Sequence, residues 1–116
     1  MQAEDIRVFI PSKDYQESRN FYKTIGFELC EVNDELTIFE SGNSTFFLQR
    51  YYNEEFAKNL MLQLIVTDIK DVFNHLQSID SISIKFQPIK NEPWGKVIYL
   101  WGPSGELWHI TELHSK

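Results

Sequence analysis

The chain lacks the features that would mark a secreted or membrane protein. Its 116 residues include a single cysteine, Cys30, so no disulfide can form within the chain and nothing points to an oxidising compartment. No stretch approaches the roughly 18 apolar residues of a membrane-spanning helix, and the first residues show no signal segment. We therefore expect a cytoplasmic protein with no membrane partner, and we expect Cys30 to be a small buried hydrophobic residue.

Basic residues are also scarce. The chain has 11 Lys and Arg against 17 Asp and Glu, a net charge of −6, and the basic residues form no cluster. Affinity for nucleic acid depends on clustered Lys and Arg, so we expect no nucleic-acid partner. What the chain does have is apolar material: 42% of residues are hydrophobic and 15% aromatic. That composition predicts one folded domain over residues 1–116.

The first half of the chain predicts one strand, one helix and three further strands. The apolar run 6–10 indicates a strand that ends before Pro11, because proline has no N–H for the ladder. Asp14 fits the N-cap of a helix, and Gly26 fits its end. The three strands are then expected at residues 27–32, 35–40 and 45–50, and a polar connection with perhaps one helical turn at residues 51–58.

The second half repeats this order. A strand is predicted at residues 60–66, and a helix that begins after Asp68, 54 residues beyond Asp14. Further strands are expected at residues 83–86, 96–101 and 106–112. An internal repeat of this length indicates two equivalent modules rather than one irregular fold.

Two stretches resemble signatures of the vicinal oxygen chelate superfamily, which includes glyoxalase I, extradiol dioxygenases and bleomycin-resistance proteins. Residues 14–27, DYQESRNFYKTIGF, are similar to its D-x3-S-x2-FY-x3-GF pattern. Residues 93–95, PWG, and 102–108, GPSGELW, are similar to its PWG and DPdGnlwE patterns. The resemblance implies an α+β fold with two tandem βαβββ modules, about 5–52 and 59–113, that form a curled mixed sheet around a cleft. It also implies a homodimer.

Metal-dependent members of that superfamily hold a divalent ion with four side chains, one each from the first and last strand of the two modules. Imidazole and carboxylate groups suit such a site, whereas arginine stays protonated and apolar side chains have no lone pair. The equivalent positions here are Arg7, Leu48 or Gln49, Met61 and His109. With one good ligand in four, we expect no metal and no cofactor.

Aromatic residues around His109 suggest a ligand-binding wall. If His109 faces the cleft, alternation turns Trp108 towards the core. A four-residue turn would pair Ile98 with His109, whereas a three-residue turn would pair Tyr99 with it and place Trp101 on the same face. Two roles stay open for His109 itself: a histidine bonded within the sheet, or a contact to the ligand. The candidate ligand-binding residues are His109, Trp94, Tyr99, Trp101 and Phe47.

The function expected from this pattern is the binding and sequestration of a small organic molecule, aromatic or cationic, as in the bleomycin-resistance proteins. One alternative is a metal-dependent lyase or dioxygenase-like enzyme with a displaced site, built from His109 and acids such as Asp5 or Glu112. A third hypothesis is a regulatory or scaffold domain with a vestigial cleft. One fold serves all three functions, so the fold alone does not choose among them.

Overall fold

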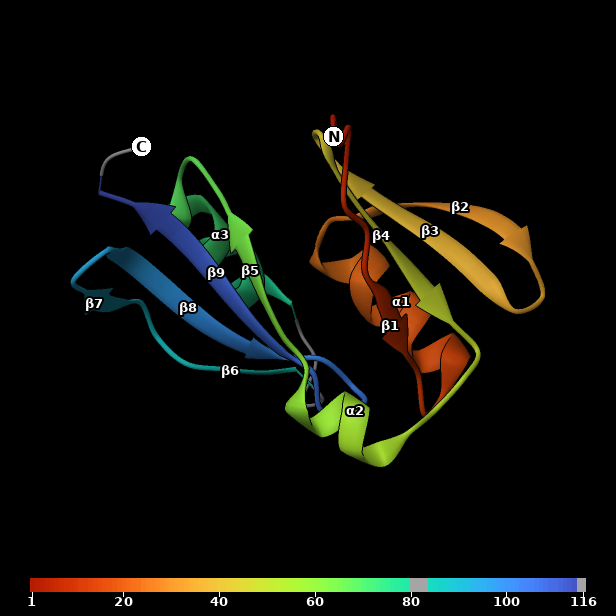
Figure 1. Ribbon diagram of the computed structural model, residues 1–116. Coiled ribbons are helices and arrows are strands. Elements are labelled where there is room, and N and C mark those ends of the chain that lie inside the picture. The colour runs from red at the N-terminus through yellow and green to blue at the C-terminus, as the bar shows by residue number, and fades with distance from the viewer. Residues whose placement is uncertain (80–83, 115–116) are drawn as a thin grey trace.

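The computed structural model describes residues 1–79 and 84–114, which form two separate sheets side by side (Figure 1). The first sheet has the order β1-β4-β3-β2, and the second has the order β5-β9-β8-β6 with β7 also paired to β8. The strands are β1 (Phe9–Pro11), β2 (Glu28–Asn33), β3 (Leu36–Ser41), β4 (Ser44–Gln49), β5 (Met61–Ile65), β6 (Lys85–Phe86), β7 (Lys90–Glu92), β8 (Gly95–Trp101) and β9 (Leu107–Leu113). The expected α+β class with its repeated order of elements is confirmed.

Three helices connect the strands: α1 (Tyr15–Ile25), α2 (Glu54–Asn59) and α3 (Ile69–Ser78). The two predicted N-caps are present. Asp14 Oδ1 accepts from the backbone N–H of Glu17 at 3.0 Å, and Asp68 Oδ1 accepts from that of Asp71 at 3.2 Å. Gly26 ends α1 with φ of 124°, a conformation that favours glycine. No helix in the described residues is both long and apolar enough to cross a membrane.

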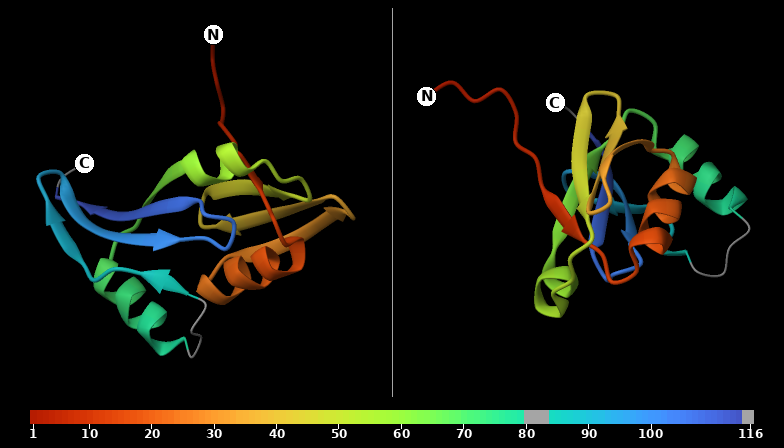
Figure 2. Two further views of the ribbon diagram at one scale, coloured as in Figure 1. Left: turned by 90° about the horizontal axis from the view of Figure 1, so that it is seen from below. Right: turned by 90° about the vertical axis from the view of Figure 1, so that its right-hand side faces the viewer.

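Several predicted boundaries were wrong. The first strand begins at Phe9 and includes Pro11, while Ile6 is 92% exposed because the chain before residue 8 runs away from the sheet (Figure 2). The helical turn expected in the connection at 51–58 is present as α2, whereas strand β7 was not predicted. Of the strand expected at 83–86, Ser83 lies outside the described residues. Cys30 is exposed, because Leu29 faces the core and alternation turns its neighbour outward.

Helices α1 and α3 cover the same side of the two sheets (Figure 2), and the core lies between. Both halves contribute to this single core: the Tyr22 ring of α1 lies 5.8 Å from the Trp108 ring of β9, and Phe46 lies 5.4 Å from the same ring. We call the opposite side of both sheets, which neither α1 nor α3 covers, the open face (Figure 2). Trp108 is 4% exposed, as its predicted core position requires.

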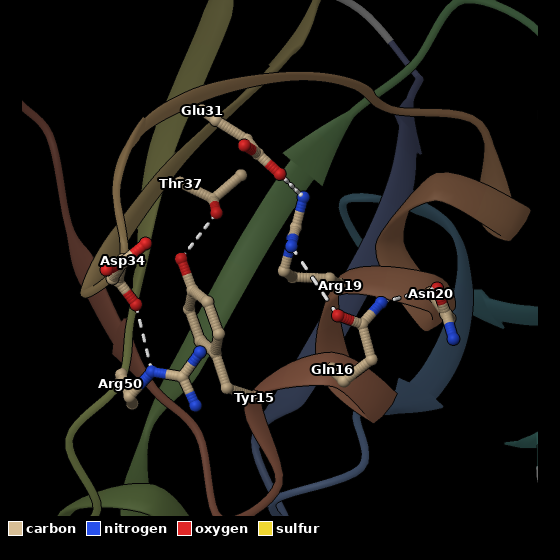
Figure 3. A network of polar contacts seen from close by, with 8 residues as sticks. All are labelled: Tyr15, Gln16, Arg19, Asn20, Glu31, Asp34, Thr37 and Arg50. Carbon is tan, nitrogen blue, oxygen red and sulfur yellow. Dashed lines mark hydrogen bonds and ion pairs between the residues drawn. The ribbon is translucent and has the colours of Figure 1, made fainter.

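A polar network fastens α1 to the hairpin between β2 and β3 (Figure 3). The hydroxyl groups of Tyr15 and Thr37 share a hydrogen bond of 2.5 Å. The Arg50 guanidinium lies 4.3 Å from the centre of the Tyr15 ring and donates to the Asp34 carbonyl at 2.9 Å, while Arg19 forms an ion pair with Glu31. These charged groups are therefore engaged in holding the first half together.

Candidate ligand-binding face

Three of the five predicted ligand-binding residues lie together on the open face of the second sheet. Tyr99 on β8 pairs with His109 on β9, and Trp101 pairs with Leu107. The Gly102 N–H donates to the Glu106 carbonyl at 2.8 Å, which closes a three-residue turn. The register is thus the three-residue alternative, with Tyr99, Trp101 and His109 on one surface.

The hydroxyl of Tyr99 is held by a residue that the sequence did not single out. It donates to Glu92 Oε2 at 2.8 Å, and Glu92 also lies 3.7 Å from the Lys90 ammonium. The hydrogen bond to Glu92, with some burial, raises the pKa of Tyr99. Glu92 was missed because β7 is only three residues long and has no apolar alternation. Its effect is to fix the Tyr99 side chain and leave its ring beside His109.

A lysine side chain already lies over the ring of Trp101. The Lys85 ammonium, on the neighbouring strand β6, lies 4.9 Å from the ring centre of Trp101. Such contacts are attractive because the face of the ring is electron-rich. A cationic ligand would have to displace Lys85 from this ring, so the site suits a neutral or anionic aromatic ligand better than the cationic one that the sequence allowed.

His109 has an unsatisfied polar atom. Its ring centre lies 4.9 Å from that of Tyr99 in an edge-to-face arrangement, and its Nε2 is enclosed without a hydrogen-bond partner in the described part of the chain. Enclosed polar atoms without partners are uncommon in native proteins. A histidine bonded within the sheet, the first of the two roles left open for His109, would need a hydrogen bond at Nε2. Among the described residues, Nε2 has none.

The other two predicted residues lie apart from this group. Phe47 is on the open face of the first sheet, where its ring packs 4.7 Å from Phe9 and under the Arg7 guanidinium at 5.7 Å. Trp94 lies in the turn before β8 and is 46% exposed. Trp101 lies seven positions further along the chain, which is about 23 Å in an extended strand.

The equivalent metal-ligand positions do not form a donor set. Arg7 is stacked on Phe47, and Met61 is exposed on β5 in the same sheet as His109. Of the two alternatives for the second position, Leu48 is buried in the core and Gln49 is half-buried on the open face. The acids of the displaced-site alternative are used elsewhere: Asp5 pairs with Arg7 at 3.0 Å, and Glu112 accepts from the Ile69 N–H at the start of α3. Among the described residues, no three His, Cys, Asp or Glu side chains converge as a metal site would need.

None of the five predicted residues lines either of two cavities found in the described part of the chain. The larger, about 430 Å³, is on the helix side and is lined by Asp14, Gln16, Glu17, Asn20, Phe21, Thr24, Ile84 and Pro103. The smaller, about 130 Å³, lies between the two sheets. The surface around Tyr99 and His109 therefore belongs to neither of these cavities.

The turn that carries β9 is anchored by a buried acid. Glu106 is 0% exposed, accepts from the Tyr22 hydroxyl at 2.6 Å, and accepts from the Ser104 N–H at 3.0 Å. Burial raises the pKa of Glu106, while these hydrogen bonds oppose the shift. Gly102 is needed here, because a Cβ at that position would collide with the Glu106 carboxyl group. The sequence motif contained both residues but gave no sign of their contact.

Neither a protein-family model nor a curated protein sequence matches the chain. Solved structures do. The bleomycin-binding protein from Streptomyces verticillus, solved with copper(II)-bleomycin, is 17% identical, with 97% of this chain and 98% of that chain covered and a TM-score of 0.82. The chain has the vicinal oxygen chelate fold.

Two further structures with this fold support the same conclusion. An antibiotic-binding protein from a Streptomyces species is 19% identical over 97% of this chain and 98% of that one, with a TM-score of 0.79. A glyoxalase/bleomycin resistance protein, also from Streptomyces, is 20% identical over 91% and 97%, with a TM-score of 0.73. The resemblance in residues 14–27 and 93–108 is thereby confirmed at the level of the fold.

Proposed function

We propose that this chain binds a small organic molecule on its open face and acts by sequestering it, without a metal and without chemical conversion. The observation that carries the proposal is the grouping of Tyr99, Trp101 and His109 on one surface. Two ring faces supply apolar area and stacking, and the half-buried imidazole lies beside them. Structures with the same fold include proteins solved as binders of bleomycin and of an antibiotic, which supports the same class of function.

The proposal includes a homodimer. Apolar side chains are exposed on the strands where the two sheets meet: Phe9 is 47% exposed on β1, and Met61 and Ile65 are 66% and 43% exposed on β5. An exposed apolar group of this kind suits burial by a protein partner. A second copy seated there would cover the open face and give the ligand an enclosed site.

The proposal also includes a cytoplasmic location, because the one cysteine cannot form an intrachain disulfide.

The metal-free part of the proposal rests on donor atoms. Of the superfamily's four ligand positions, His109 supplies a good donor, while Arg7, Leu48 or Gln49, and Met61 do not. The ligand class follows from the surface: a flat aromatic molecule, neutral or anionic, because Lys85 already occupies the face of Trp101.

The test is a screen of flat aromatic molecules, neutral, anionic and cationic, by tryptophan fluorescence and calorimetry. We expect saturable binding, recovery of the molecule unchanged, and a loss of at least tenfold in affinity for Trp101→Ala and for His109→Ala. Tyr51→Ala, an exposed aromatic beside α2, is the matched control and should bind normally. Titration of Ni²⁺, Zn²⁺, Fe²⁺ and Mn²⁺ runs in parallel. Tight metal binding that His109→Ala removes, or turnover of the bound molecule, would overturn sequestration in favour of an enzyme.

A further inference from the structure

The smaller cavity is a slot between the two sheets. It lies where β1 and β4 of the first sheet come near β5 of the second, and the two sheets share no hydrogen-bonded strands. Its lining residues come from both halves of the chain and from residues remote in sequence: Val8, Phe27, Ser44, Thr45, Phe46, Leu62, Gln63, Leu64 and Trp108. The slot therefore exists only because the two halves are packed side by side.

The inner wall of the slot is apolar. Phe27, Phe46 and Trp108 belong to the core, and their rings pack against one another at 5.1 to 6.0 Å between centres. Leu62 and Leu64 are partly buried and complete this wall from β5. For comparison of size, an engineered apolar cavity of about 150 Å³ takes up benzene. A slot of about 130 Å³ thus has the size of a single ring or a branched aliphatic group.

The rim of the slot is polar and faces the open face. Thr45 is two residues before Phe47 on β4, so alternation places it on the open face with Phe47. Gln63 pairs with His109 across β5 and β9, and its amide lies 3.4 Å from Thr111 Oγ1. The entrance is therefore next to the surface formed by His109 and Tyr99, and the slot continues that surface into the core.

We propose that this slot is a binding subsite for a compact apolar group, a single aromatic ring or a branched aliphatic group. The group is one part of the sequestered molecule, whose polar body lies on the open face against Tyr99 and His109. The placement of the ligand's polar body rests on the proposed function. The slot is formed by this chain alone, so its binding of an apolar group can be tested without the ligand. The ligand class becomes narrower as a result: a flat polar molecule with one compact apolar substituent.

The test uses benzene as the probe, read by NMR at the Trp108 indole N–H. That N–H donates to the Tyr22 hydroxyl at 3.0 Å on the slot's inner wall, and its resonance is assigned by removing the other two signals with Trp94→Phe and Trp101→Phe. We expect a saturable shift of the Trp108 resonance at millimolar benzene and no such saturation with naphthalene. Val8→Phe fills the slot and should abolish the shift. Thr45→Phe, on the rim at the open face, should block entry without disturbing the core.

Val32→Phe is the matched control, because it adds the same volume at an exposed position of β2 outside the slot, and it should bind benzene as the wild type does. No saturable shift in the folded wild type, or an unchanged shift in both filled variants, overturns the proposal. Binding that emerges only after Ile6→Ser also overturns it, because the slot would then hold the chain's own N-terminal segment. Trp101→Ala separates the two proposals: it should abolish binding of the flat ligand while benzene still binds.

Discussion

The hydroxyl of Tyr22, on the helix of the first half, donates a 2.6 Å hydrogen bond to Glu106 at the turn before β9 in the second half. The same hydroxyl accepts from the Trp108 indole N–H at 3.0 Å. All three side chains are buried, so each bond replaces one that water would otherwise make. This chain of hydrogen bonds joins the two halves and holds the turn from which His109 and its strand extend.

Removal of the Tyr22 hydroxyl should destabilise the fold. In Tyr22→Phe the ring is retained, but Glu106 loses a hydrogen-bond donor and the Trp108 N–H loses its acceptor. We expect a cost of about 1–3 kcal/mol in the free energy of unfolding. Urea denaturation measures the change. Tyr51→Phe removes a hydroxyl from an exposed tyrosine and should cost almost nothing. Equal losses in the two variants would show that the buried contact contributes no stability.

Glu106 should make stability depend on pH. Burial raises the pKa of this carboxyl above its ordinary 4.5, so between that value and the higher folded pKa the folded state binds more protons than the unfolded state. The contribution of Glu106 to the free energy of unfolding is then greatest below pH 4.5 and falls as the pH rises through the folded pKa. The Glu106→Gln variant cannot titrate. From pH 4 to 7, the wild type should therefore lose stability relative to this variant, in paired urea titrations. Parallel curves would contradict the raised pKa.

Gly102 should tolerate no side chain. A Cβ there would meet the Glu106 carboxyl group, so Gly102→Ala should cost about 1–3 kcal/mol through overpacking. The cause can be tested with Glu106→Ala, which removes the obstructing carboxyl. The two changes should be strongly non-additive, because the second relieves the clash that the first creates. Strict additivity in thermal unfolding would place the cost of Gly102→Ala elsewhere.

The two Asp N-caps show why much of this fold was predictable. Asp14 and Asp68 act locally, each through a bond to the backbone three residues on, and a local interaction leaves its pattern in adjacent residues. Tyr99 and Trp101 were nearly as accessible to prediction, since strand alternation and the length of one turn decided their face. The resemblance in residues 14–27 and 93–108 added the arrangement of the two modules, which no local pattern contains.

Contacts between remote residues were not predictable. Tyr22 and Glu106 are 84 positions apart, and nothing in either neighbourhood indicates the other. Cys30 shows a different limit: its apolar character suggested burial, but the strand's alternation gave the inner position to Leu29. The slot between the sheets depends on how two separately formed sheets pack, which is a property of the whole chain and not of any segment.

The proposed dimer gives the last prediction. Met61 and Ile65 project from the open face of β5 with much of their apolar surface exposed, and burial of that surface in a second copy would stabilise association. We expect sedimentation equilibrium to show a dimer, and Met61→Lys with Ile65→Lys to shift it towards monomer by at least tenfold in the dissociation constant, because the interface would then bury two charges. Asn20→Lys with Thr24→Lys, at exposed positions of α1 on the helix side, adds the same two charges away from this face and should leave the dimer intact. A wild type that stays monomeric at high concentration would reject the dimer and leave the ligand on an open surface. The affinity for flat ligands should then be the same at all protein concentrations, whereas a site completed by a second copy should bind more tightly as the dimer forms.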